Sequence, residues 1–327
     1  MKSALLKEST IARWLLLGST FVAALSACSL SQTPPMPSDD QAYYFGRYTF
    51  TAPTDGSGIW SAYDVIGERI ELISHDGRQD IDKHLDERIA GLKKMQKFGY
   101  AAYDQTIRLD GGGAIVVSKD RYYDFDIFYL TDKNMLYRQK VDMIDLPSLN
   151  KATSLAREVN SYIHFRSLSD PPPTNTFAIE NGYMKLPIDK FNEQVSIGLP
   201  VTSIPGIHLT FDTRVIGRPE PGLIARYEQR TSGFVMPLLM KLITRSTVLR
   251  KTRKEVAGLM FDELLIRSRA EGKNVYAFRL EYPGTPDSSL EPYTVLELST
   301  VDSGPGFMND AQALQFWDRL TSSLRRL

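Results

Sequence analysis

The sequence predicts an α+β protein of two similar domains, each an antiparallel sheet with helices packed on one face. Three observations lead to this fold class. Segments in which apolar residues alternate are mixed with segments that have helical apolar spacing. A proline-rich break divides the chain near its middle, and the predicted elements follow the same order on both sides of it.

Composition sets the first limits on function. The 327 residues are 42% hydrophobic and 24% charged, which is enough apolar material for two domains with a core each. Lysine plus arginine and aspartate plus glutamate number 39 each, so no bulk charge draws the chain toward a polyanion. We therefore expect no nucleic-acid partner.

The first 27 residues have the pattern of an export signal. Lys2, Lys7 and Arg13 come before an apolar stretch from Trp14 to Leu25. This stretch is too short to span a bilayer as a mature helix, but it has the length of a signal-peptide core. We predict that residues 1–27 are a signal peptide.

The single cysteine, Cys28, follows this stretch directly. The sequence Leu25-Ser26-Ala27-Cys28 resembles the lipobox, in which the cysteine is acylated and becomes the first mature residue. The alternative is an ordinary secretory signal that leaves Cys28 as a free thiol. Ser29 is not the aspartate typical of inner-membrane retention. We therefore expect a periplasmic protein, anchored by lipid on Cys28 to the inner face of the outer membrane.

Two segments with little to bury are expected to connect folded parts. Residues 28–41 are rich in proline, serine and aspartate, as in a flexible tether. Residues 167–176 contain three consecutive prolines, which neither a helix nor a central strand accommodates. They predict a linker between an N-terminal domain, residues 42–166, and a C-terminal domain, residues 177–327.

The first half opens with a strand-like segment, Gly46 to Pro53, and β-prone sequence from Tyr63 to Ile73. A helix should follow, because apolar residues recur at helical spacing with aspartates before them and lysines after them. These apolar residues are Ile81, Leu85, Ile89 and Leu92. Alternation at Phe125, Ile127 and Tyr129 predicts a strand, and a stripe at Leu149, Ala152, Ala156, Val159 and Ile163 predicts a closing helix.

The second half repeats this order. A strand-like segment, Gly182 to Pro187, comes before a predicted strand from Ile207 to Ile216 and a helix from Pro221 to Arg230. Alternation at Tyr276, Phe278 and Leu280 predicts a further strand. The closing helix should begin after Asn309 or Asp310 as N-cap and bury Ala313, Trp317, Leu320 and Leu324.

The histidines offer little to catalysis. Asp80 and His84 are spaced to share a helix face, with His75 nearby, but no second histidine follows at the next turn to complete a metal site. His164 and His208 fall in a predicted helix and strand, where structural roles are expected. The chain has neither a Gly-x-Ser-x-Gly elbow nor a cysteine nucleophile. We therefore expect no enzyme, no metal and no cofactor.

Four other segments have a functional and a structural interpretation. Residues 111–113 are three glycines, but no lysine-serine pair follows, so a turn is favoured over a phosphate site. The apolar run from Phe234 to Ile243 contains a proline and a lysine and reads as a buried helix. The tyrosine pairs 43–44 and 122–123 could be binding anchors or half-buried strand residues.

Three blocks in the C-terminal part form a recognisable series: Arg253 to Glu263, Pro292 to Thr300, and Phe316 to Arg326. In the first, a basic segment leads into Val-Ala-Gly and acidic residues. In the second, a strand ends in Leu-Glu-Leu-Ser/Thr, and in the third, a final helix carries Trp-Asp and then Ser-Leu-Arg. This series resembles the immunity proteins that protect bacteria from type VI secretion phospholipase effectors of the fourth lipase class. Phe261 stands where the family's turn has a second glycine.

This resemblance implies two similar domains arranged as a claw that grips the effector between them and keeps its Ser-His-Asp site from lipid. The expected partner is therefore a cognate phospholipase effector, and the hot spots should lie on loops that face the interdomain cleft. The sequence does not name the contact residues. An outer-membrane scaffold or assembly lipoprotein that binds another envelope partner remains the alternative, because it would share the signal, the tether and the missing active site.

Overall fold

The computed structural model describes residues 40–232, 246–270, 272–301 and 304–327. The predicted signal peptide, Cys28 and all but the last two residues of the predicted tether lie outside the described residues. The apolar run from Phe234 to Ile243 also lies outside them. Residues 36–327 belong to one compact unit.

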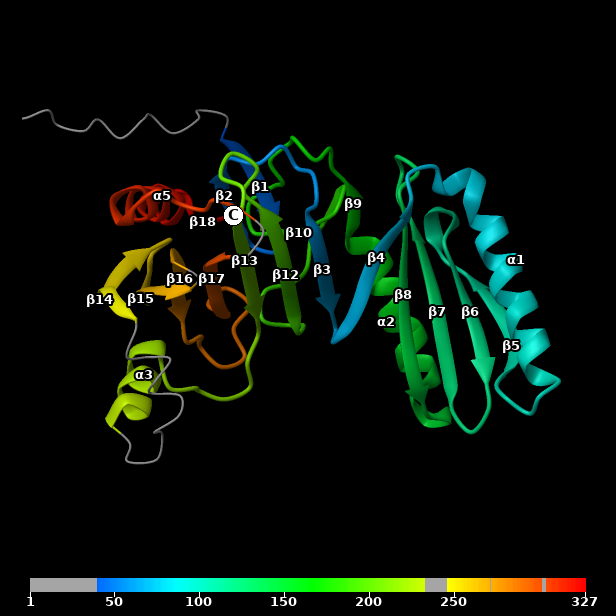
Figure 1. The fold of residues 1–327 in the computed structure, drawn as a ribbon. Helices are drawn as coiled ribbons and strands as arrows, with labels where there is room; N and C mark the ends of the chain where they lie inside the picture. Colours follow the sequence, from blue (N-terminus) through cyan, green and yellow to red (C-terminus); the bar gives the residue numbers. More distant parts are fainter. Residues whose placement is uncertain (1–39, 233–245, 271, 302–303) are drawn as a thin grey trace, which may run out of the picture. The chain divides into compact units, whose positions relative to one another are not determined.

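Antiparallel strands and helices build the described part of the chain (Figure 1), which confirms the predicted α+β class. The four described helices are α1 (Gly77–Gln96), α2 (Leu149–Tyr162), α3 (Leu223–Ser232) and α5 (Asp310–Ser323). Each lies where the sequence predicts a helix, but α2 ends at Tyr162. Ile163 and His164, predicted to lie in that helix, belong to strand β9 (Ile163–Phe165) instead. Two short 3-10 turns, η1 (Asp110–Gly112) and η2 (Leu146–Ser148), complete the helical elements.

Twelve strands form one antiparallel sheet in the order β14-β15-β16-β17-β13-β12-β3-β4-β8-β7-β6-β5. The N-terminal half supplies β3 (Trp60–Val65), β4 (Glu68–Ser74), β5 (Ala102–Arg108), β6 (Ala114–Lys119), β7 (Tyr123–Leu130) and β8 (Leu136–Ile144). The C-terminal half supplies β12 (Glu193–Pro200), β13 (Ile207–Arg214), β14 (Thr247–Val256), β15 (Leu259–Ala270), β16 (Lys273–Tyr282) and β17 (Tyr293–Thr300). The two halves therefore share one sheet.

Two small sheets complete the strand pairing. The first contains β1 (Gln41–Phe45), β2 (Tyr48–Ala52) and β18 (Arg325–Arg326), and the second contains β9 (Ile163–Phe165), β10 (Phe177–Ile179) and β11 (Gly182–Met184). Phe45 and Tyr48 pack on Phe211 of β13, with ring centroids 4.8 and 5.5 Å apart. The first strands of the chain thus pack on the C-terminal half of the sheet.

The halves of the large sheet meet in a short hairpin. Strands β3 and β4 form three residue pairs next to their turn, and the turn approaches a side chain of β8: Gln139 Nε2 donates to the carbonyl oxygens of Val65 and Glu68 at 2.9 and 3.2 Å. Strand β12 pairs with β3 over six residues. The division into domains at residues 167–176 stays a prediction.

The helices lie on opposite faces of the sheet, so the prediction that they pack on one face was wrong. Ile81 and Leu85 of α1 pack with Val116 and Phe128, whereas Ala156 of α2 belongs to the core cluster of the other sheet face. In the second half, Phe278 of β16 meets Trp317 of α5, while Glu281, also on β16, meets Arg226 of α3. Apolar spacing shows which helix face is buried, but not which face of a sheet receives it.

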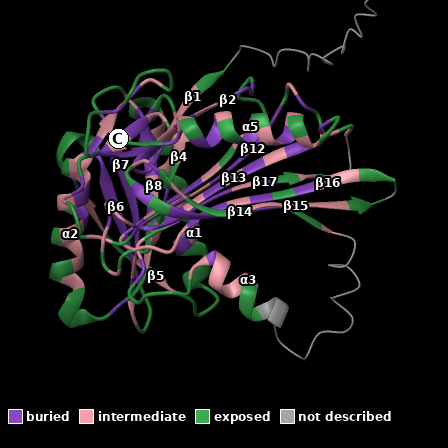
Figure 2. Cartoon of the chain, turned by 90° about the vertical axis from the view of Figure 1, so that its left-hand side faces the viewer, coloured by how far each residue is buried: buried purple, intermediate pink, exposed green. Residues whose placement is uncertain are grey.

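The side chains on one face of the sheet are almost completely buried, and Figure 2 shows that the central strands consist largely of buried residues. The largest fully buried side chain is Trp317 of α5, whose indole NH donates to Glu263 Oε1 at 2.9 Å. Lys254 also pairs with this fully buried carboxylate, at 2.9 Å. The side chain of Asn309 accepts the amide of Gln312 at 2.9 Å, which confirms the predicted N-cap of this helix.

Replacement of Trp317 by alanine should lower the free energy of unfolding by about 3–5 kcal/mol, because it opens a cavity and removes the hydrogen bond to Glu263. Urea unfolding followed by circular dichroism measures this change. Trp60→Ala is the matched control, since Trp60 is 50% exposed. Equal losses in both variants would contradict the assigned packing.

Candidate binding surface

One face of the central strands carries no described helix. Along β12, Val195, Ile197 and Leu199 belong to the buried core, so Ser196 and the position of Gly198 face the other side. Residues that pair across neighbouring strands lie on the same face of the sheet. Ala62 pairs with Ser196, Ser196 with Asp212, and Asp212 with Val295, so all four lie on this second face. We call the second face of β3, β12, β13 and β17 the open face.

Helices flank the open face at both of its ends. Toward β8, the same face continues through Asp64, Arg69, Glu71 and Arg138, and it is covered where α1 packs on β6 and β7. Toward β15, it continues through Glu281 and Asp262, which meet α3. The open face of β3, β12, β13 and β17 therefore lies between α1 and α3.

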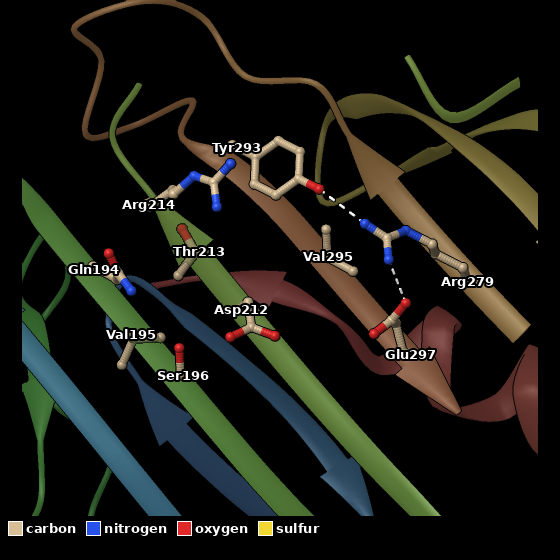
Figure 3. Close-up of a pocket in the computed structure, with 10 residues that line it drawn as sticks. All are labelled: Gln194, Val195, Ser196, Asp212, Thr213, Arg214, Arg279, Tyr293, Val295 and Glu297. Carbon is tan, nitrogen blue, oxygen red and sulfur yellow. Dashed lines mark hydrogen bonds and ion pairs between the residues drawn. The ribbon is translucent and has the colours of Figure 1, made fainter. Parts of the chain in front are cut away.

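A pocket of about 180 Å³ lies on this face. Its walls come from β12, β13, β16 and β17 (Figure 3), and they include Gln194, Ser196, Asp212, Arg214, Arg279 and Glu297. Alternation explains the gathering, because each strand that buries apolar residues beneath the sheet presents its polar residues here. The pocket is an open polar depression with charges of both signs.

Most charges in the pocket are neutralised within the chain. Arg279 pairs with Glu297 and, at 2.8 Å, with Glu281, and it donates to the Tyr293 hydroxyl at 2.9 Å. Burial works to lower the pKa of Arg279, but Glu297 and Glu281 raise it above its usual range. Arg214 lies over the Tyr293 ring at 4.6 Å. These contacts hold both guanidinium groups in fixed positions.

Asp212 differs from its neighbours. It is half-buried on β13, and no hydrogen bond or ion pair joins its carboxylate to the residues that the structure describes. In Figure 3 its carboxylate lies between Ser196 and Glu297, away from the Arg279 contacts. The pocket thus presents one uncompensated negative charge, which suits a lysine or arginine of a partner.

Trp60 adds an exposed aromatic group to the open face. A Cβ atom on Gly198 would lie 1.8 Å from the Trp60 indole nitrogen, so only glycine lets the ring lie against the strand at this position. Gly198 pairs with both Trp60 and Thr210, which places the ring one row from Asp212. Half of the Trp60 side chain remains exposed. Tryptophan is among the residues that most often dominate protein–protein affinity.

The predicted metal candidates do not come together. The Asp80 carboxylate accepts the Ser74 hydroxyl at 2.6 Å, the His84 ring stacks on Phe128 at 6.4 Å, and His75 is exposed. No group of three or more histidine, cysteine, aspartate or glutamate residues in the described ranges could hold a metal ion. No helix within those ranges has the length and hydrophobicity needed to cross a membrane.

The other singled-out residues have structural roles. Residues 111–113 lie in the β5–β6 connection, where a Cβ on Gly113 would meet the Phe128 carbonyl oxygen at 2.6 Å. Tyr123 is buried in β7, and Tyr43 donates to the Thr54 carbonyl at 3.2 Å. Phe261 is buried in β15, beyond the turn that Ala257 and Gly258 form with positive φ. The hairpin therefore closes without the second glycine.

Comparisons with known proteins identify a family and solved structures that this chain resembles. The sequence model described as Tle cognate immunity protein 4 C-terminal domain matches residues 170–326. The apo structure of immunity protein TplEi of T6SS from Pseudomonas aeruginosa has a TM-score of 0.76 at 19% identity, covering 88% of this chain and 97% of that one. No curated protein sequence matches the chain.

Two further solved structures share this fold. The immunity protein TplEi from Pseudomonas aeruginosa complexed with "L" peptide has a TM-score of 0.75 at 21% identity, covering 88% of this chain and 98% of its own. A chain in the crystal structure of the Tle4-Tli4 complex has a TM-score of 0.76 at 19% identity, with coverages of 88% and 97%. At these identities the likeness shows the fold.

The stability of the fold should decrease as the pH falls below about 6.5. Burial lowers the pKa of both His164 and His208, so the unfolded chain binds these protons more readily than the folded one. Stability from these groups is complete above the unfolded pKa, and it is lost as the pH falls from that value through the lower pKa of the folded state. Urea unfolding at pH 7.5 and 5.5 measures the loss, and the double variant His164→Gln/His208→Gln should reduce it. The same loss in the double variant would contradict this assignment; the exposed His75→Gln is the control.

Proposed function

We propose, from the premise that residues 170–326 belong to the Tle cognate immunity protein 4 family, that this chain is a type VI secretion immunity protein that binds and inhibits a phospholipase effector. The family match carries the proposal. The likeness of the fold to TplEi and to a chain of the Tle4-Tli4 complex supports it, because that likeness covers 88% of the chain and thus both halves. The protein would act by binding and not by catalysis.

The open face is the surface that we assign to the effector. It involves four strands, with α1 and α3 packed on the same side of the sheet beyond its two ends. In this proposal the two helices would act as the arms of the claw. A stable complex needs about 800 Å² from each partner, which a loop or cap of a globular effector could bury between the flanking helices. Occupation of the effector's lid or entrance would keep lipid from its active site.

Trp60 and Asp212 are the proposed centre of this contact. Trp60 is an exposed aromatic ring already held against Gly198, so its binding would cost little conformational entropy. Asp212 supplies the unpaired charge and would bind a basic side chain of the effector. The surrounding ion pairs, such as Arg279 with Glu297, would exclude water around that centre.

We also propose that the protein is exported and anchored through an acylated Cys28. The apolar core from Trp14 to Leu25, the lipobox-like residues before Cys28 and the absence of any other cysteine from the sequence support this. A periplasmic antidote held at the membrane would meet the effector where its lipid substrate lies. A soluble antidote would have to reach it by diffusion.

Growth of cells that export the cognate effector to their periplasm tests the proposed function. The full-length chain should restore growth, and deletion of residues 1–27 should abolish the rescue because the antidote stays in the cytoplasm. Cys28→Ser removes the acylated atom, so less protein should sediment with membranes. If both proteins are exported and growth is not restored, the immunity proposal fails. The alternative, an outer-membrane scaffold or assembly lipoprotein, is then favoured.

Two substitutions test the assigned surface. Trp60→Ala and Asp212→Asn should each weaken effector binding by at least about tenfold, as expected for residues at the centre of an interface. Isothermal titration calorimetry with purified effector gives the dissociation constants. Met308→Ala and Asp132→Asn are the matched controls, because both residues are exposed and neither lines a pocket with Trp60 or Asp212. Unchanged affinity in both test variants would move the interface elsewhere without removing the immunity function.

A further inference from the structure

One end of the first-half sheet gathers three chain connections. Residue pairing runs from Ala102 of β5 to Lys119 of β6, from Lys119 to Tyr123 of β7, and from Tyr123 to Ile144 of β8. The α1–β5 connection, the β6–β7 turn and the β8–η2 connection therefore emerge at the same end. Figure 1 shows this end at the lower tips of β6, β7 and β8.

The most exposed large hydrophobic side chains of the described residues all lie at this end. Met143 is 71% exposed, Phe98 70%, Leu146 68% and Tyr100 64%. Every other large hydrophobic residue in the described ranges is less exposed than these four. We call Phe98, Tyr100, Met143 and Leu146 the apolar end. Exposed apolar side chains gathered at one edge suit a contact with a protein or a membrane.

The backbone holds these side chains outward. Gly99 has a positive φ of 80°, and the amides of Phe98 and Tyr100 both donate to the Met95 carbonyl oxygen, at 2.9 and 3.4 Å. Met143 also has a positive φ, and its amide donates to the Asp124 carboxylate at 2.9 Å. The apolar side chains are thus presented by built turns, with hydrogen bonds that close each loop.

Basic residues border Phe98 and Tyr100. Lys93, Lys94 and Lys97 precede them, and no acidic residue occurs between Arg88 and Asp104. None of the three lysines forms an ion pair with a described residue. On the other side of the apolar end the charges are mixed. Asp142 pairs with Lys140 at 2.8 Å, the carboxylate of Asp145 accepts the Ser148 amide at 3.0 Å, and the exposed Asp120 lies between Lys119 and Arg121 in the β6–β7 turn.

We infer that the apolar end inserts into the headgroup region of an anionic phospholipid bilayer. Phe98, Tyr100, Met143 and Leu146 would enter the boundary between headgroups and acyl chains, where aromatic and flexible apolar side chains are favoured. The three lysines would extend to the lipid phosphates while their stems cover apolar surface. The open face uses other strands, so this contact does not depend on effector binding.

Vesicle binding by residues 36–327 tests the inference, because this compact unit lacks Cys28 and cannot be held by an acyl chain. The unit should cosediment with vesicles of phosphatidylcholine containing 30% phosphatidylglycerol, and much less with phosphatidylcholine alone. Lys93→Gln/Lys94→Gln/Lys97→Gln should weaken binding to the anionic vesicles by about 100-fold at low salt. Phe98→Ser/Tyr100→Ser should weaken it by about tenfold or more.

Matched variants elsewhere provide the controls. Leu168→Ser/Met308→Ser changes two exposed apolar residues, and Lys133→Gln/Lys185→Gln/Lys273→Gln removes three exposed lysines. Both control variants should bind vesicles like the unchanged unit. No vesicle binding, or equal losses in test and control variants, would overturn the inference. So would loss of effector binding in Phe98→Ser/Tyr100→Ser with vesicle binding intact, which would make the apolar end a protein interface.

Discussion

The alternation of side chains along a strand is the constraint on which the rest of the structure depends. Each strand of the large sheet that buries one set of residues must present the other set on the opposite face. One face is covered by α2, the two small sheets and α5, and its core extends from Ile115 in β6 to Leu265 in β15. The second face is covered by α1 and α3 and stays open between them. The proposed binding surface is thus the part of the sheet that the core and the described helices leave uncovered.

A buried ion pair fixes the N-terminal strands on this scaffold. Arg47, in the turn between β1 and β2, makes two hydrogen bonds to the Glu193 carboxylate of β12, at 2.7 and 2.6 Å, and both residues are almost fully buried. A third bond runs from Arg47 to the Asn175 carbonyl at 3.0 Å. Loss of either partner would leave a buried charge, so the pair specifies where β1 and β2 pack. Residues 41–52 are thereby tied to the C-terminal half of the sheet.

Local patterns predicted the helices but not their partners. The apolar stripes that include Leu85, Val159 and Leu320 identified α1, α2 and α5, because the apolar spacing of a helix can be recognised within one continuous segment of sequence. The pairing of β3 with β12 could not be predicted, since alternation assigns faces without naming a neighbouring strand. Sequence reasoning also missed Trp60 and Asp212. Neither lies in a recognisable motif. The proposed role of Trp60 depends on its contact with Gly198, and that of Asp212 depends on the ion pairs around it.

The internal pairing of charges on the open face has a consequence for recognition. Arg279 and Arg226 together neutralise Glu297 and Glu281. Burial works to raise the pKa of Glu281, but the hydrogen bonds that it accepts from Arg226 and Arg279 hold that pKa below its usual range. These groups are ordered before any partner arrives, so a complex would lose little side-chain entropy by enclosing them. They also repel a partner that offers a charge without a counterpart. Specificity would then depend on Asp212, the carboxylate of this pocket that has no partner among the described residues, and on the shape that Trp60 gives to the face beside it.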